Sequence, residues 1–356
     1  MTRVLKIDPQ RPDPFAIEEA ARELLRGRLV AFPTETVYGL GAHAFDSGAV
    51  QRLFEAKGRP PTDPVIVHIP HADHMNALAE AIPQVAYELG RRFWPGPLTL
   101  ILRKLASVPD AITAGRPTVG VRVPSHAIAR LLLETAAVPI AAPSANRFSR
   151  PSPTSAAHVL DDLDGVIDLV VDGGPTPLGV ESTIVDLTVT PPLVRRPGGV
   201  TIEALRAIVP DVEITHELQR VARPQHAPGQ FRRHYAPKAP MTLYVGELEG
   251  VTQRIAADAR TVVASGSRVG ILAPEDDLRE LAPRLAAVAT AGRIATRPYG
   301  TRSDPMTTAR ELFAALRDLD QAGVDLILAA APAAHGIGTA VVDRLTRAAE
   351  GRVIYV

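Results

Sequence analysis

The chain has 356 residues, more than the ~250 to 300 at which one hydrophobic core stops growing, so we expect two domains. Its 46% hydrophobic and 22% charged residues are typical of a globular protein and exclude wholesale disorder or a coiled-coil rod. Basic and acidic residues number 39 each, so no overall positive field attracts a nucleic acid. Because cysteine is absent, disulfides, thiolate metal sites and cysteine nucleophiles are excluded.

No segment has the composition of a membrane span. The longest later apolar run, residues 326–334, is far shorter than the ~20 residues that a span needs. Residues 1–14 are charged and interrupted by proline, unlike a signal peptide. We therefore expect a cytoplasmic protein with no membrane partner.

Residues 1–212 predict a mixed α/β domain. A helix over 16–26 ends at a glycine, a strand follows at 29–32, and Ser47 can cap a second helix before an extended segment at 65–69. Further strands are expected at 98–102, 119–123, 138–141, 167–171 and 184–187, and further helices near 84–93, 126–136 and 201–208.

A linker is expected over residues 213–240, followed by a second, smaller domain over 241–356. The linker is rich in proline and in basic residues, and no acid occurs between Glu217 and Glu247. Beyond it, strands at 243–245, 268–272 and 324–328 and helices at 305–318 and 339–349 predict an α/β domain with a parallel sheet.

The usual nucleotide-binding signatures are missing. No Gly-Lys pair occurs, which excludes a P-loop. The segment from Gly39 to Ala44 has the letters of a dinucleotide fingerprint, but neither a clean preceding strand nor the expected acid about 20 residues later. We interpret its glycines as a tight bend.

Four short clusters hold the polar residues that could carry chemistry. They are the run Pro33–Gly41 after a strand, the pair of cations in Lys57–Pro60, the segment Ala142–Asn146 after another strand, and the basic, aromatic segment Pro228–Pro237 in the linker. Taken singly, each has a structural explanation: a turn, a cation at a helix end, a helix cap or a solvated tether.

Together these clusters resemble the two-domain threonylcarbamoyl-AMP synthases over nearly the whole chain. The most specific matches are Lys57-x-Arg59, Ser144-x-Asn146, Pro33–Gly41 and His234-Tyr235-Ala236-Pro237. The resemblance implies a YrdC-like N-terminal domain, with a twisted mixed sheet and helices, and a smaller, Rossmann-like α/β C-terminal domain. It also implies an enzyme that joins L-threonine, bicarbonate and ATP into threonylcarbamoyl-AMP and pyrophosphate, for the threonylcarbamoyladenosine modification of tRNA.

The resemblance implies a role for each matched residue. The implied catalytic residues are Lys57, Arg59, Ser144 and Asn146. The implied ATP-binding residues are Arg59, Asp63, Thr118, Ser144, Ser152, Arg196 and Tyr235, and those for L-threonine are Thr36, His68, Arg122, Ala142 and Ser182. The linker residues Arg232, Arg233 and His234 are expected to form a lid. Mg²⁺ is expected with ATP, and the implied partners are a tRNA threonylcarbamoyl transferase and, by weak contact, tRNA.

These cationic and hydrogen-bonding residues suit the implied chemistry, in which a carboxylate, a carbamate and a triphosphate must gather in one place. The fork of Arg122 suits the substrate carboxylate. Two positions depart from the family pattern: Asp63 stands where asparagine is expected, and Ala142 stands where relatives often carry a hydroxyl.

Two other functions compete with this interpretation. A YrdC-like module that binds RNA without synthase activity is the first, and the zero net charge disfavours it. A transferase acting on carbamoyl phosphate, as in hydrogenase-maturation proteins, is the second. Those proteins carry zinc-finger-like cysteines, which this chain lacks.

Overall fold

The computed structural model describes residues 1–215, 225–229, 231, 233–286 and 292–356. They form two compact units. The N-terminal unit comprises Met1–Phe148 and Ser152–Gln230, and the C-terminal unit comprises Ser149–Pro151 and Phe231–Val356. The predicted boundaries of the linker, 213 and 240, stay predictions, because residues 216–224 lie outside the described residues.

The N-terminal unit is built on a mixed sheet in the order β1-β9-β2-β3-β8-β4-β7-β6-β10-β11-β12, with β5 paired to β6. Its strands are β1 Arg3–Lys6, β2 Val30–Pro33, β3 Tyr38–His43, β4 Ile66–His68, β5 Ala79–Glu80, β6 Leu98–Lys104, β7 Thr118–Arg122, β8 Ile140–Ala141, β9 Leu169–Asp172, β10 Thr183–Asp186, β11 Leu193–Arg196 and β12 Glu213–Ile214. Strands β4 and β7 run parallel, as do β6 and β10, whereas β2 and β3 form an antiparallel pair.

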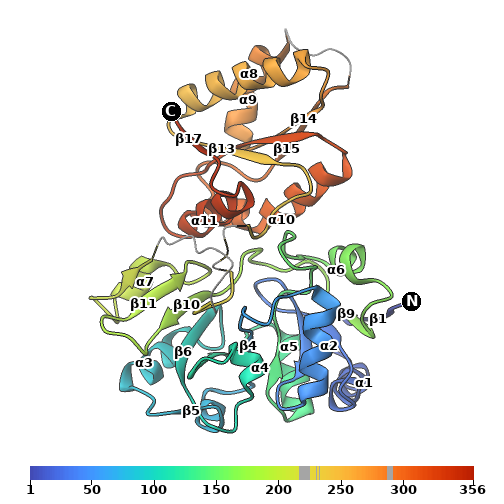
Figure 1. The fold of residues 1–356 in the computed structure, drawn as a ribbon, viewed down its shortest axis with the longest axis vertical. Coiled ribbons are helices and arrows are strands. Elements are labelled where there is room, and N and C mark those ends of the chain that lie inside the picture. Colours follow the sequence, from blue (N-terminus) through green and yellow to red (C-terminus); the bar gives the residue numbers. More distant parts are fainter. Residues whose placement is uncertain (216–224, 230, 232, 287–291) are drawn as a thin grey trace. The chain divides into compact units, whose positions relative to one another are not determined.

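Helices cover both faces of this sheet. They are α1 Pro14–Leu25, α2 Ser47–Lys57, α3 Gln84–Phe93, α4 Asp110–Thr113, α5 Ala127–Ala136, α6 Ala156–Leu163 and α7 Ile202–Arg206, with a 3₁₀ turn at Ala72–Ala77. Helices α1 and α5 lie side by side (Figure 1), and their leucines Leu24 and Leu132 pack with Phe32 of β2. The neighbouring Ala31 belongs instead to the core that contains Leu53 of α2, because successive strand residues face opposite sides of a sheet.

The C-terminal unit is a doubly wound α/β domain. Its strands β13 Met241–Val245, β14 Val269–Ala273, β15 Ile294–Pro298, β16 Leu326–Ala330 and β17 Val353–Tyr355 form a parallel sheet in the order β15-β14-β16-β13-β17. Helices α8 Leu248–Ala264 and α9 Glu275–Ala286 cover one face, and α10 Pro305–Gln321 and α11 Gly338–Ala348 cover the other (Figure 1). The predicted fold class, a mixed α/β domain followed by a Rossmann-like one, is confirmed.

The tight bend predicted between Gly39 and Ala44 is wrong. This segment lies in strand β3, which pairs with β2 in register from Val30–Gly41 to Pro33–Tyr38. Glycine is required at position 41 by packing rather than by a turn, because an added Cβ would lie 2.9 Å from the Phe32 ring and 3.2 Å from the Val30 carbonyl oxygen. The reversal of the chain occurs earlier, at residues 34–37.

Within the described ranges, no helix is both long enough and apolar enough to cross a membrane.

Candidate active site

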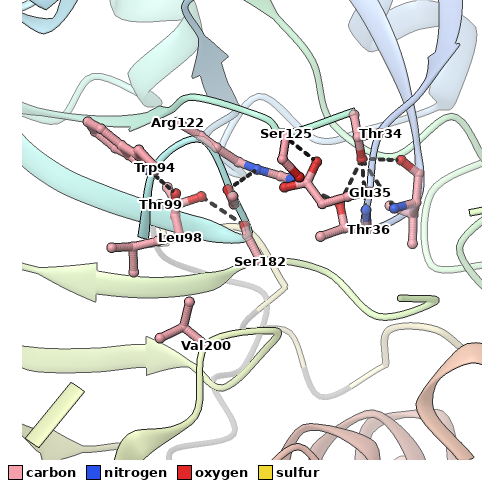
Figure 2. Close-up of polar contacts among 12 residues, drawn as sticks. Thr34, Glu35, Thr36, Trp94, Leu98, Thr99, Arg122, Ser125, Ser182 and Val200 are labelled. Carbon is pink, nitrogen blue, oxygen red and sulfur yellow. Dashed lines mark hydrogen bonds and ion pairs between the residues drawn. The ribbon is translucent and has the colours of Figure 1, made fainter. Parts of the chain in front are cut away.

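The turn between β2 and β3 is held by the hydroxyl of Thr34. This oxygen accepts hydrogen bonds from the backbone N–H groups of Thr36 (3.2 Å) and Val37 (3.3 Å), and it lies 2.8 Å from the Thr36 hydroxyl (Figure 2). Such a side-chain-to-backbone turn is a common use of threonine. Here it places the Thr36 side chain against the end of β7.

Arg122, the last residue of β7, is buried and is held on three sides. Its Nε donates to the Gly96 carbonyl oxygen (3.3 Å) and its Nη1 to the Thr36 hydroxyl (3.1 Å), while Nη2 forms an ion pair with Glu35 (2.7 Å). The second carboxylate oxygen of Glu35 accepts from the Ser125 N–H (3.1 Å), as Figure 2 shows. The sequence motifs indicate no role for Glu35, although it precedes Thr36 in the first cluster.

His68 lies beside Arg122, because β4 and β7 pair with these two residues in register. The imidazole is buried, and burial together with the nearby Arg122 charge lowers the pKa of His68 to about 3. Among the described residues, its Nδ1 has no hydrogen-bond partner. A neutral imidazole with an unused nitrogen can therefore offer a hydrogen bond to a ligand.

Ser182 connects the expected L-threonine residues to the expected ATP residues. Its hydroxyl lies 2.8 Å from that of Thr99 on β6 (Figure 2). Arg196, at the end of β11, donates to the Ser182 carbonyl oxygen (3.0 and 3.2 Å) and to its hydroxyl (3.2 Å). Thr99 is a second residue that sequence analysis missed; it stands in an ordinary strand pattern, with no motif around it.

Lys57 ties three of the four sequence clusters together. It ends helix α2, and Gly58 closes that helix in the left-handed conformation (φ 61°). The Lys57 ammonium donates to the carbonyl oxygens of Ser144 and Asn146. Ser144 in turn forms an isolated β-bridge with Gly39 of the first cluster. Burial and the neighbouring Arg59 charge hold the pKa of Lys57 well below its ordinary value.

Arg59 is fixed by the chain that follows it. Its Nε donates to the Asp63 carbonyl oxygen (3.1 Å), and its Nη2 donates to that of Pro64 (2.6 Å) and pairs with the Asp63 carboxylate (2.9 Å). Burial raises the pKa of Asp63 to about 6, although Arg59, Lys57 and Arg196 oppose the shift. In this chain, Asp63 thus serves first as the partner of a site arginine.

The remaining expected ligand residues of the N-terminal unit lie near these groups. Ser152 is buried and donates to the Glu181 carboxylate, next to Ser182 in the sequence. Ala142 is buried after β8, and its N–H donates to the Ile66 carbonyl oxygen (3.0 Å), so this amide is not available to replace the missing hydroxyl. Thr118 lines a pocket on the sheet.

His226 and Pro228, in the middle of the expected linker, form part of that pocket. Its lining includes Ile66, Thr99, Thr118, Ile184, His226 and Pro228. Ala227 packs with Ile66, Ile101 and Ile184, Gln225 donates its N–H to the Thr62 carbonyl oxygen (2.9 Å), and His226 contacts Arg116 (3.0 Å). This segment therefore belongs to the wall of the N-terminal unit.

The later linker residues belong to the C-terminal unit. Arg233 is exposed and pairs with Glu350 (2.8 Å). His234 and Tyr235 are buried, and the Tyr235 ring stacks with Phe313 at a centroid distance of 5.5 Å. The expected lid residue Arg232 lies outside the described residues.

Comparisons with known proteins agree with this architecture. A model of the Sua5/YciO/YrdC family, described as telomere recombination, matches residues 22–198, and one described as threonylcarbamoyl-AMP synthase, C-terminal domain, matches residues 200–350. A Pyrococcus abyssi protein named threonylcarbamoyl-AMP synthase is 42% identical over 100% of both chains. The chain belongs to the threonylcarbamoyl-AMP synthase family.

Further relatives and solved structures extend the match. The Bacillus subtilis threonylcarbamoyl-AMP synthase is 41% identical over 98% of this chain and 95% of its own. The crystal structure of P. abyssi Sua5 complexed with L-threonine superposes with a TM-score of 0.91 at 41% identity, covering 100% of each chain. Escherichia coli YciO matches 55% of this chain and 94% of its own, with 26% identity and a TM-score of 0.50.

The lowered pKa of His68 predicts a specific pH dependence of stability. The folded chain holds this imidazole neutral. Its contribution to the free energy of unfolding is therefore complete above pH ~6.5 and is lost as the pH falls toward 3. From pH 7 to pH 5, the wild-type chain should lose about 2 kcal/mol of unfolding free energy through this group. His68→Gln should lack this loss. Urea unfolding, followed by the fluorescence of the single tryptophan Trp94, measures it.

The exposed His74 provides the control, since His74→Gln should keep the wild-type pH dependence. If His68→Gln and the wild-type chain had the same pH dependence, the pKa of His68 would be the same in the folded and the unfolded chain, and the prediction would be wrong.

Proposed function

We propose that this chain is an L-threonylcarbamoyladenylate synthase, which forms threonylcarbamoyl-AMP and pyrophosphate from L-threonine, bicarbonate and ATP. The observation that carries the proposal is the buried Arg122, oriented by Thr36 and Glu35 beside a neutral His68. The L-threonine complex of P. abyssi Sua5, a relative of nearly the same fold, supports the same choice of substrate.

The reaction requires two events in one place. The amine of threonine must react with bicarbonate to give a carbamate and water, and a carbamate oxygen must then attack the α-phosphorus of ATP and expel pyrophosphate. Each event crowds anions together, so catalysis depends mainly on fixed cations and donors. Lys57, Arg59, Arg122 and Arg196 are all buried and already hydrogen-bonded in place, so the chain need not reorganise them during the reaction.

On the amino-acid side, we assign the carboxylate of L-threonine to Arg122. The ion pair with Glu35 and the bonds to Thr36 and Gly96 leave part of the guanidinium for this ligand and fix its direction. The hydroxyl of Ser182 and the neutral ring of His68 are proposed to contact the rest of the substrate, and Ala142 to supply an apolar surface.

On the nucleotide side, we assign the phosphates to Arg59, Ser144 and Arg196, with Lys57 and Asn146 completing the reacting centre. Thr118, Ser152 and Tyr235 are proposed as further nucleotide contacts, and Asp63 as the partner that orients Arg59. Mg²⁺ is proposed to arrive with ATP, held chiefly by phosphate oxygens and water, as is usual for this ion with nucleotides.

The product is a labile mixed anhydride, so a second enzyme must receive it. We propose hand-over in the cytoplasm to a tRNA threonylcarbamoyl transferase. A weak contact with tRNA would rest on exposed arginines such as Arg147 rather than on net charge.

The substrate requirement tests the proposed function directly. Pyrophosphate release should need L-threonine and bicarbonate together. L-Serine should be a poorer substrate by ~1 to 3 kcal/mol in transition-state binding, because it leaves the space of the methyl group empty. A coupled pyrophosphate assay with each component omitted in turn measures both effects. Equal turnover with serine, or turnover without bicarbonate, would contradict the assignment.

The linker is proposed to act as a lid, because its residues His226 and Pro228 line the pocket that contains Thr118. A chain that ends at Asp211 should lose most of its synthase activity although it keeps Lys57 and Arg59, and Tyr235→Ala should raise the KM for ATP. ATP with threonine should protect the linker of the full chain from limited proteolysis. If ligands give no protection and the shortened chain matches the full-length rate, the linker is only a tether.

A further inference from the structure

Thr99 lies on the same face of the N-terminal sheet as the residues assigned to L-threonine. It is the second residue of β6, and the register of β6 with β7, in which Leu100 pairs with Val121, brings it level with Arg122. Residues opposite one another in two paired strands face the same side of the sheet. The Thr99 methyl group also lies on this side, because a Cβ added at Gly120, two residues before Arg122, would lie 3.4 Å from it.

The Thr99 hydroxyl forms a buried contact with the hydroxyl of Ser182. The two oxygen atoms lie 2.8 Å apart (Figure 2), and either of them can be the donor. Both side chains are buried. Buried polar groups take their hydrogen bonds from the protein or from a ligand, so these two partners decide where each of the two hydroxyl protons points.

The backbone at Ser182 is held by other contacts. Arg196 donates to the Ser182 carbonyl oxygen, and the next residue, Thr183, donates its N–H to the Pro97 carbonyl oxygen (2.9 Å). The Thr183 hydroxyl donates to the Val200 carbonyl oxygen (2.5 Å) and accepts from the Val200 N–H (3.0 Å). Because these bonds already fix the start of β10, the contact between the two hydroxyl groups mainly sets the direction of the Ser182 hydroxyl.

The hydrogen bonds at the Ser182 hydroxyl oxygen decide what this residue can offer to a ligand. The oxygen already accepts from Nη2 of Arg196 (3.2 Å), because a guanidinium can only donate. A serine hydroxyl can accept two hydrogen bonds and donate one. If Thr99 donates to the second accepting position, the single Ser182 proton is left for an oxygen atom of a ligand. If Ser182 donates to Thr99 instead, it has no proton to offer.

We propose that Thr99 is a positioning residue for L-threonine. Its hydroxyl donates to the Ser182 oxygen and thereby reserves the Ser182 proton for an oxygen atom of the amino acid. The Arg196 guanidinium and the Thr99 hydroxyl then both donate to one oxygen, which polarises the Ser182 hydroxyl and strengthens the bond that it donates. The inference rests on the proposed function in one respect, the assignment of Ser182 to L-threonine.

The affinity of Thr99→Val for L-threonine, measured by calorimetry without ATP, tests the proposal. Valine keeps the shape of the side chain and suits a strand, but it removes the hydroxyl. The dissociation constant should rise about 5- to 20-fold, as expected when one buried hydrogen bond is lost. Thr99→Ser keeps the hydroxyl and should bind L-threonine as the wild-type chain does. An unchanged dissociation constant in a folded Thr99→Val protein would overturn the proposal.

Two further measurements separate a positioning role from general damage to the site. In Thr99→Val, the KM for L-threonine should rise while the KM for ATP stays unchanged, because Arg196 keeps its bonds to the Ser182 carbonyl oxygen. The double variant of Thr99→Val with Ser182→Ala should bind L-threonine no more weakly than Ser182→Ala alone, since both changes act through one proton. Additive losses in the double variant would contradict the positioning role.

Thr113→Val is the matched control. Thr113 is a buried threonine that lines the same pocket as Thr99, but its hydroxyl donates to the Asp110 carbonyl oxygen (3.3 Å). This variant should bind L-threonine as the wild-type chain does, and an equal loss in it would assign the effect to the packing of the pocket and refute the proposal. A wild-type chain that binds L-threonine but releases no pyrophosphate would instead count against the proposed function alone.

Discussion

The candidate active site is joined at one buried ammonium group. Lys57 ends helix α2, and its Nζ donates to the carbonyl oxygens of Ser144 and Asn146, which follow strand β8. A helix end and a strand end are thereby joined at a single point. A lysine can make this contact because its charge is compact, whereas the broad fork of arginine needs more room. The chain has only four lysines, so the choice is informative.

The arginines of the site are held in the same way as Lys57, by carbonyl oxygens. Its cations are held largely by carbonyl oxygens: Arg59 by those of Asp63 and Pro64, Arg122 by that of Gly96, and Arg196 by that of Ser182. Carbonyl oxygens fix a cation without cancelling its charge, unlike a full set of carboxylates. The carboxylates of Glu35 and Asp63 compensate part of this charge. The remaining positive charge suits the proposed function, in which a carboxylate, a carbamate and a triphosphate gather in one place.

Much of the candidate site could be predicted because its residues stand in short motifs at the ends of helices and strands. Lys57 and Arg59 stand at the end of helix α2, and Ser144 and Asn146 follow strand β8. The structure places Lys57 in contact with both members of the Ser-x-Asn motif. The strands and helices of both domains could also be predicted, since hydrophobic residues repeat with different periods in strands and in amphipathic helices.

Other features depend on partners that are distant in the sequence. Thr99 matters because Ser182 lies opposite it on a neighbouring strand, and nothing around Thr99 indicates this. Gly41 was predicted to lie in a bend. Glycine is needed there because strand pairing brings the Phe32 ring close to it, and the local sequence does not show that pairing. The attachment of Ser149–Pro151 to the C-terminal unit depends on Arg317 and Asp320, more than 160 residues away in the chain. Local pattern carries no information about such contacts.

The central claim, that the Lys57 ammonium organises the catalytic centre, is tested most directly by the single-turnover rate of Lys57→Met at saturating ATP, L-threonine and bicarbonate. Methionine keeps a long, apolar side chain but removes the charge and the donors to Ser144 and Asn146. The account predicts a rate lower by roughly 10² to 10³, the usual loss when one preorganised electrostatic group is removed, in a protein that remains folded by circular dichroism. A folded Lys57→Met protein with a near-normal rate would contradict it, and Lys57 would then be only a cation at the end of a helix.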